Sequence, residues 1–529
     1  MRKKFNTAGP CIEARHYMLP AAARVAHVRT LIEDGSFFVI HAPRQVGKTT
    51  SMMALAKELT EEGTYAALVV TCEQGSAFRN QLEGSERALL ASWRTHAEAS
   101  LPLELQPPAV EGLASGNAFQ EWLRQWSLAC PRPLVLFLDE VDALENEVLI
   151  NLLRQLRAGY PLRPKQFPHS IALFGMRDIR DYKVASGGSD RLNTASPFNV
   201  KAESLTLHNF TRDEVFSLLR QHTDATGQVF EPEALEHVWY LTRGQPWLVN
   251  ALARQLVEVL VPDRAQSIRQ DVVEEATEIL IKRRDTHLDS LGERLREPRV
   301  KRVLTAMLSG ELLPDLPEDD LRYVTDLGLL EKRPDEGLVA ANPIYAQIIP
   351  RVLTNILETS ISGFRPTWLN PTTGQLELTR LQASFLEFWR EHGTALLGAS
   401  PYAEAAPQLV LMAFLHRVAN GGGRVQREYA IGSGRLDLLL EFKGVKLAIE
   451  CKVKRPRRRE PVAEGLIQLD RYLQGLSWPE GWEGSDTFQA WLFVTEQNPA
   501  WMQSDDPPPP PRTEWRFTPG RRKVLVIWG

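Results

Sequence analysis

Cysteine is scarce in this sequence, with 4 in 529 residues, and no two cysteines lie close together. Structural zinc sites and disulfide frameworks both need cysteines at short, paired spacings. The 11 histidines also form no HxxxH pair of the kind that places two ligands on one helix face. We therefore expect neither a zinc centre nor a disulfide framework, and we interpret the cysteines as reduced thiols.

Long apolar runs are absent as well. No uninterrupted apolar stretch reaches the length that a membrane-spanning helix requires, and none follows the basic start Met1–Lys4. These absences predict a cytoplasmic protein with no membrane partner. A strong excess of charge is also missing, because the net charge is -4, so only a local basic patch could attract nucleic acid.

The remaining composition is typical of folded domains. Hydrophobic residues make up 43% of the chain and charged residues 24%, which are the proportions of an ordinary soluble protein and not of a disordered or membrane protein. A chain of 529 residues is longer than one hydrophobic core usually organises. Roughly two to four domains are therefore expected.

A loop that contains glycine and lysine, Ala42–Thr49, follows a predicted strand at residues 37–40 and precedes a predicted helix. In this order, backbone amides of the loop can wrap phosphates, Lys48 can reach the outer oxygens, and the Thr49 hydroxyl can bind Mg2+. Ala42 stands where the pattern usually begins with Gly, and it would be strained if that position needed a positive φ.

Two acidic residues, Asp139 and Glu140, follow a second apolar strand at 134–138. At the carboxyl end of a parallel strand they would lie beside the phosphates. Asp139 would hold the magnesium shell, and Glu140 would orient or deprotonate the attacking water. Taken singly, the loop could be an ordinary helix start and the acids a solvated strand end, but their order along the chain favours a phosphate site.

Two further strands, 66–71 and 170–174, complete the predicted sheet. Arg177 follows the second of them, which places it at the same sheet edge as the acidic residues. It is either a sensor of the γ-phosphate or a partner in a structural ion pair. Arg180 and Arg191 are looser candidates for contacting phosphate in a neighbouring subunit.

These motifs together resemble the AAA-like, STAND-related P-loop ATPases that carry a Glu beside the Walker B Asp. The resemblance covers roughly residues 1–355. Its phosphate motifs are specific and its flanking motifs are not. The segments that carry it are Phe5–Pro10, His41–Thr50, Asp139-Glu140, Gly175–Asp178 and Gly244–Pro246.

The resemblance implies that ATP and Mg2+ are the cofactors and that a homo-oligomer can complete the site. It makes Asn6 and Pro246 neighbours of the nucleotide, with the Gly-x-Pro turn in a nucleotide-sensing helical subdomain. Thr49 and Asp139 would hold the metal. The residues expected at the nucleotide are Gly47, Lys48, Thr49, Thr50, Asp139 and Arg177.

The middle of the chain favours helices. Residues 211–295 have helical periodicity and are predicted to form a lid-like helical subdomain. Residues 296–360 alternate short helices with two short strands, which indicates a winged helix. Such a fold could bind DNA, but the acidic run Glu318–Asp320 argues against phosphate contact and favours a regulatory or packing role.

Two strands near the C-terminus are predicted to form a hairpin around Lys443-Gly444. If Phe442 pairs with Val445, Asp437 stands opposite Glu450. Facing carboxylates repel each other unless a cation lies between them. Lys452 projects from the same face as Glu450, so the hairpin predicts a magnesium site with a cation beside it.

This hairpin resembles the PD-(D/E)XK nuclease superfamily, although the Pro that often precedes the Asp is missing. The resemblance implies that Asp437 and Glu450 bind Mg2+ and act with Lys452 in catalysis. Gln468, on the next helix, matches an accessory catalytic position, and Glu404 is a loose additional acid. The alternative is an edge hairpin with ordinary surface charges.

A dense basic run begins in the proposed site and continues past it. Such a run usually lies in a solvated loop, but beside a phosphodiesterase site it would neutralise backbone phosphates without reading the sequence of bases. Its members are Lys452, Lys454, Arg455, Arg457, Arg458 and Arg459.

The sequence therefore predicts an α/β protein with four parts. A P-loop parallel-sheet ATPase core occupies 1–210, a helical subdomain 211–295, a winged-helix subdomain 296–360, and an α/β restriction-endonuclease-like domain 361–529. We expect an ATP-driven switch that controls a magnesium-dependent nuclease acting on nucleic acid. DNA is the expected partner, and the sequence does not distinguish DNA from RNA as the substrate. The alternative is a switch whose C-terminal domain binds nucleic acid or protein without cleaving it.

Overall fold

The computed structural model divides the chain into two compact units. The first unit comprises Met1–Asp289 and Glu318–Ile344, and the second comprises Ser290–Pro317 and Tyr345–Gly529. The described residues are 2–43, 45–78, 81–144, 146–175, 201–283, 292, 294–295, 297–308, 316–333, 337–349, 367–370, 372–399, 406–419, 423–431, 434–454, 461–475, 487–496 and 510–529. None of the helices within these ranges is long and apolar enough to cross a membrane.

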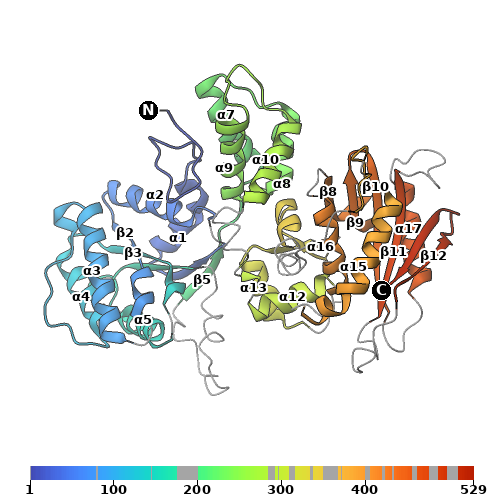
Figure 1. The fold of residues 1–529 in the computed structure, drawn as a ribbon. Helices are drawn as coiled ribbons and strands as arrows, with labels where there is room; N and C mark the ends of the chain where they lie inside the picture. The colour runs from blue at the N-terminus through green and yellow to red at the C-terminus, as the bar shows by residue number, and fades with distance from the viewer. Residues whose placement is uncertain are drawn as a thin grey trace. The chain divides into compact units, whose positions relative to one another are not determined.

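A five-stranded parallel sheet forms the centre of the first unit (Figure 1). Its strands follow the spatial order β2-β3-β4-β1-β5. The strands are β1 (Phe37–His41), β2 (Ala66–Thr71), β3 (Leu134–Asp139), β4 (Ser170–Gly175) and β5 (Lys201–Thr206). The first four confirm the strands predicted from apolar runs, whereas β5 was not predicted.

The side chains of each strand alternate between the two faces of this sheet. Phe38 and Ile40 belong to the core on the side of α1 and α2, while Phe37 and Val39 belong to the core on the side of α3, α4 and α5. The sheet is therefore buried on both faces, as a parallel sheet requires. The helices are α1 (Ala26–Glu33), α2 (Lys48–Glu61), α3 (Leu82–Ser100), α4 (Ala118–Ala129) and α5 (Asn146–Gly159).

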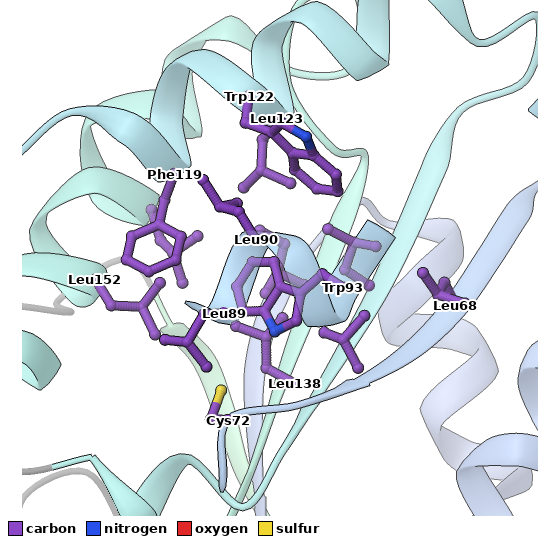
Figure 2. Close-up of a cluster of buried hydrophobic side chains, with 14 of the residues drawn as sticks. Leu68, Cys72, Leu89, Leu90, Trp93, Phe119, Trp122, Leu123, Leu138 and Leu152 are labelled. Atoms are coloured by element: carbon purple, nitrogen blue, oxygen red, sulfur yellow. The ribbon is translucent and has the colours of Figure 1, made fainter. Parts of the chain in front are cut away.

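Aromatic side chains fill the larger of these two cores (Figure 2). The Trp93 ring lies 5.4 Å from Phe119 and 6.3 Å from Trp122 between ring centroids. The Trp93 indole also donates a hydrogen bond to the Thr71 carbonyl, with 2.9 Å between N and O. Because the indole N–H finds this partner, the ring can be fully buried without an unmade hydrogen bond. This core fixes the C-terminal end of β2.

Four α-helices follow β5 in the described residues 207–283, within the range where a helical subdomain is expected. The first begins with a capping box, in which the Thr211 hydroxyl and the Glu214 carboxylate each accept a backbone N–H of the other. It ends at Gly227, which has a left-handed φ of 79°. The helices are α7 (Arg212–Thr226), α8 (Pro232–Thr242), α9 (Pro246–Arg254) and α10 (Gln270–Arg283).

The predicted winged-helix region contributes to both units. In the first unit, α13 (Glu318–Asp326) is followed by an antiparallel hairpin of β6 (Leu330–Arg333) and β7 (Gly337–Ala340). In the second unit, this region contributes α12 (Pro298–Leu308). The helix-then-hairpin order of the first unit agrees with the strands expected there.

A six-stranded mixed sheet forms the centre of the second unit, in the order β12-β13-β11-β10-β9-β8 (Figure 1). Strands β10, β11 and β13 are parallel, and the other neighbours are antiparallel. The strands are β8 (Gly423–Ile431), β9 (Gly434–Phe442), β10 (Val445–Lys454), β11 (Phe488–Glu496), β12 (Arg512–Phe517) and β13 (Lys523–Trp528).

Helices cover both faces of this second sheet. Leu469 and Tyr472 of α17 pack on the apolar face that contains Leu492 and Val526. Aromatic side chains pack on the other face, where the Trp389 ring lies 4.8 Å from Phe493. The helices are α15 (Leu378–Ala399), α16 (Ala406–Ala419) and α17 (Val462–Gly475).

Candidate nucleotide and phosphodiester sites

The phosphate loop joins the end of β1 to the start of α2. Gln45 and Gly47 have positive φ angles of 60° and 91°, so the backbone turns sharply before the helix begins at Lys48. Ala42 is buried and is not among the residues with positive φ. Its departure from the usual Gly therefore introduces no left-handed strain.

Lys48 reaches back over the loop from the first turn of α2. Its ammonium donates hydrogen bonds to the carbonyl oxygens of Ala42, at 2.7 Å, and Pro43, at 2.9 Å. The positive charge is thus held at the N-terminus of a helix, where backbone N–H groups already favour an anion. Next to it, the Thr50 hydroxyl accepts a hydrogen bond from the Cys11 backbone, at 3.1 Å.

Thr49 and Asp139 meet although they are 90 positions apart in the sequence. The Thr49 hydroxyl donates to Oδ2 of Asp139 at 2.5 Å. Asp139 ends β3 and is 8% exposed. One strand, β4, separates β3 from β1, so the parallel sheet brings both ends to one edge. A hydroxyl and a carboxylate are hard oxygen ligands, which is the donor set that Mg2+ prefers.

Glu140 projects into solvent directly after β3. Its backbone is left-handed, with φ 55° and ψ 39°, and its N–H donates to Oδ1 of Asp139 at 2.9 Å. A left-handed conformation at a residue other than Gly costs free energy and tends to occur at functional sites. Arg177, with Arg180 and Arg191, lies outside the described residues.

The N-terminal segment joins the phosphate loop to the helical subdomain. The Trp247 indole, one residue after Pro246, donates to the Thr7 carbonyl at 3.0 Å. Asn6 donates within its own segment to the Gly9 carbonyl at 2.9 Å. The structure therefore brings the two flanking motifs predicted from the sequence into contact with each other.

The C-terminal hairpin has the register that the two-residue loop predicts. Phe442 pairs with Val445, and the antiparallel pairing runs on to Leu438 with Ile449. Oδ2 of Asp437 then accepts the Cys451 backbone N–H at 2.8 Å.

Glu450 is 3% exposed and lies next to two charged groups. The Lys452 ammonium is 3.1 Å from Oε1 of Glu450, while Oε2 is buried without a hydrogen-bond partner. Burial, followed by the nearby Asp437 carboxylate, raises the pKa of Glu450 to about 8, although Lys452 partly opposes both effects. Burying a carboxylate oxygen without a hydrogen-bond partner costs free energy. A cation bound at this position would offset that cost.

Helix α17 packs against the same site. The amide oxygen of Gln468 is buried without a hydrogen-bond partner, and a Cβ atom added to Gly465 would lie 3.3 Å from Cγ of Lys452. Glu464 of this helix lies 3.8 Å from the Lys452 ammonium and was not predicted from the sequence. No group of three or more His, Cys, Asp or Glu side chains forms a metal-ligand cluster in the described part of the chain.

Some predicted residues of the C-terminal site cannot be placed. Glu404 and the basic residues from Arg455 to Arg459 lie outside the described residues, whereas Lys452 and Lys454 lie on β10.

Sequence reasoning also missed a cluster at the end of β1. There, the His41 imidazole lies 3.0 Å from the Thr206 hydroxyl and 3.6 Å from Asp326 of α13.

Comparison with known proteins assigns the N-terminal part of the chain. Residues 22–163 match the family model described as an AAA ATPase domain, so the first unit carries such a domain on a parallel α/β sheet, as the residues predicted. A comparison with curated proteins finds no match.

Several solved structures are similar to part of the chain. A Walker-type ATPase of Pyrococcus abyssi is 15% identical, with 65% of this chain and 99% of that chain covered and a TM-score of 0.46. The RuvB Holliday junction branch migration motor of Thermotoga maritima is 17% identical, with 62% and 92% covered and a TM-score of 0.33. Cdc6p of Pyrobaculum aerophilum is 14% identical, with 64% and 93% covered and a TM-score of 0.34.

Proposed function

We propose that this protein is an ATP-hydrolysing switch, related to the STAND ATPases, that controls a magnesium-dependent nuclease in its own C-terminal unit. The single observation that carries the nuclease assignment is the buried, partly unsatisfied carboxylate of Glu450, which lies between Asp437 and Lys452. The AAA ATPase match at residues 22–163 supports the switch.

At the proposed nucleotide site, different residues would bind the phosphates, hold the metal ion and orient the water. Gly47 and Thr50 belong to the loop and first helical turn that would cradle the phosphates, with Lys48 as the nearby positive charge. The touching pair of Thr49 and Asp139 would hold Mg2+. Glu140, exposed beside this pair, would orient the attacking water, and Arg177 is proposed to sense the γ-phosphate.

At the C-terminal site, the residues fit a divalent cation. Asp437 and Glu450 offer carboxylate oxygens, and the unpartnered oxygen of Glu450 leaves room for a ligand bond. A bound Mg2+ would stabilise the negative charge that develops on phosphate during hydrolysis. Lys452 would hold the water or the phosphate, and the free amide oxygen of Gln468 would position one of them.

Control by ATP requires a part of the first unit that responds to the phosphate loop. A Cβ atom added to Gly328 would lie 2.4 Å from Cγ of Pro43, so the segment after α13 packs directly on the loop. Asp326 also approaches His41 at the end of β1. These contacts favour the packing role of the winged-helix segment over DNA binding, and homo-oligomer formation is proposed for the active state.

A nuclease assay with a matched pair of variants tests the proposal. The full chain with Mg2+ and ATP should cleave linear, circular or single-stranded DNA, or RNA. Glu450→Gln should lower the cleavage rate at least about 100-fold, because it removes a metal-binding charge, while DNA binding is kept. Glu441→Gln, whose side chain pairs with Lys446 on the same hairpin, should cleave like the parent.

The alternative function has a distinct outcome in the same assay. If the parent protein binds DNA or a protein but cleaves no substrate under any of these conditions, the C-terminal unit is a binding module. The buried Glu450 would then have only a structural role, and Glu450→Gln would leave binding unchanged.

A further inference from the structure

Arg24 connects the phosphate loop to the segment that leads into the helical subdomain. It lies in the short helix η1 (Ala22–Val25), and its guanidinium is partly buried. One nitrogen, Nη1, donates to the Val46 carbonyl of the loop at 2.9 Å, and Nη2 donates to the His208 carbonyl at 2.6 Å. The two acceptors are far apart in the sequence, so the planar fork of a single arginine holds both.

The hydrogen bond to Val46 also sets the direction of the next amide. In a planar trans peptide, the carbonyl oxygen of one residue and the N–H of the next point in opposite directions. Because the Val46 carbonyl points toward Arg24, the Gly47 N–H points to the other side of that peptide. A Cβ atom added to Gly47 would lie 3.1 Å from Nη1 of Arg24, so the guanidinium lies close behind the glycine.

The other end of the contact reaches the segment 207–211, which joins β5 to α7 and is named the hinge below. The Arg24 guanidinium lies 4.7 Å from the centroid of the Phe210 ring. The Phe210 N–H donates to the Gly244 carbonyl at 2.9 Å, and a Cβ atom on Gly244 would lie 1.9 Å from the Phe210 carbonyl oxygen. Movement of Phe210 must therefore move the Gly-x-Pro turn that starts α9.

Arg24 forms no ion pair within the described part of the chain, and its two hydrogen bonds go to neutral carbonyls. Burial lowers the pKa of its guanidinium, opposed by the Glu214 carboxylate. A partly desolvated cation that has no carboxylate within ion-pair distance among the described residues is unfavourable by itself. The two hydrogen bonds and the Phe210 ring stabilise the Arg24 guanidinium against this cost. A bound anionic ligand near the loop would stabilise it further.

We propose that Arg24 is a positioning residue that presents the Gly47 amide to the phosphates and couples the phosphate loop to the hinge 207–211. This inference rests on the proposed ATP site. It adds the contacts through which nucleotide binding at the phosphate loop would affect the helical subdomain. When the phosphates of ATP bind the loop, they shift Val46. Arg24 transmits that shift to His208 and Phe210 through its contacts with both residues.

Variants of Arg24 in the full chain test the role, with Arg29 as the control. Arg29 pairs with Glu58 and Glu62 on the surface. Arg24→Met should raise the KM for ATP about 10-fold or more, the effect of a lost charge-assisted hydrogen bond, with a smaller change in kcat. Hydrogen exchange at 207–211 should no longer respond to an ATP analogue. Arg24→Lys should restore part of the affinity, and Arg29→Met should match the parent.

A second variant separates coupling from folding. Phe210→Leu removes the ring beneath the guanidinium but leaves the contacts with Val46 and His208, so it should keep the parent KM and reduce the exchange response at residue 210. An Arg24→Met protein with the parent KM and the parent exchange response overturns the inference, as does an unchanged response in Phe210→Leu. A parent protein that binds no ATP refutes the proposed function instead.

Discussion

Burial has opposite consequences for Asp139 and Glu450. Both oxygens of Asp139 accept a hydrogen bond, one from Thr49 and one from the Glu140 backbone, so each has a partner within the protein. Glu450 is more deeply buried and one of its oxygens has no partner. Its charged form therefore depends on Lys452 and, under the proposed function, on a bound cation.

His222 predicts a pH dependence of stability in the first unit. Its ring is buried near Phe5 and Tyr17, and burial lowers its pKa below 6.5, a shift that the hydrogen bond with Gln228 only partly offsets. The folded protein therefore binds a proton at His222 less readily than the unfolded chain does. Below about pH 6.5 the unfolded chain binds a proton that the folded chain does not, so stability is present above that pH and is lost as the pH falls.

The expected result is a smaller loss of Tm in His222→Phe than in the parent between pH 7.5 and 5.5, because phenylalanine keeps the ring packing and cannot titrate. Melting curves at several pH values measure it. His27→Gln, at an exposed position on α1, should follow the parent. Equal losses of Tm in parent and His222→Phe would contradict the assignment.

At the scale of the element, turns decide where the functional residues lie. The phosphate loop depends on the positive φ of Gly47, and the entry to α9 depends on Gly244, whose φ is 71°. Gln245 then caps α9 by accepting the Leu248 N–H at 2.6 Å. The helix and the loop are held by backbone conformations that few other residues adopt.

Two glycines with similar φ angles allow strain and steric clash to be separated. Gly227 has a φ of 79° and open space where a side chain would begin, whereas a Cβ on Gly244 would meet the Phe210 backbone. Gly227→Ala should cost about 1 kcal/mol and lower the Tm of the first unit by about 2–4 °C. Gly244→Ala should lower it at least twice as much and weaken ATP binding. Equal Tm shifts in thermal melts would show that the clash is relieved without cost.

At the scale of the whole molecule, the chain divides into a unit with the AAA ATPase domain and a unit with the candidate nuclease site. Under the proposed function, the switch needs a nucleotide-bound state that lasts long enough to act on the second unit. Glu140 is the residue whose substitution should prolong that state.

Glu140→Gln should bind ATP with the affinity of the parent and hydrolyse it about 100-fold more slowly, the usual effect of losing a general base. After a single addition of ATP, this variant should continue to cleave nucleic acid, because the bound ATP is hydrolysed slowly. Lys48→Ala should lose both ATP binding and ATP-dependent cleavage, and Glu147→Gln, exposed on α5, should behave like the parent. Measurements of ATPase turnover and cleavage on the same samples test this; parental turnover in Glu140→Gln would show that another group activates the water.

The sequence by itself determined the elements whose signals are local. Four strands of the first sheet, the phosphate loop and the register of the Phe442–Val445 hairpin follow from short apolar runs and turn residues. These patterns depend on residues a few positions apart, where alternation and turn chemistry are decisive. Strand β5 escaped prediction because Lys201–Thr206 has no continuous apolar run.

Only the tertiary structure decided which distant groups meet. The placement of Arg24 between Val46 and His208 and the approach of Asp326 to His41 join residues that are far apart in the sequence. Such contacts depend on strand order and helix packing, which no local pattern encodes. The same holds for the burial that leaves an oxygen of Glu450 without a partner, because burial is a property of the packed core.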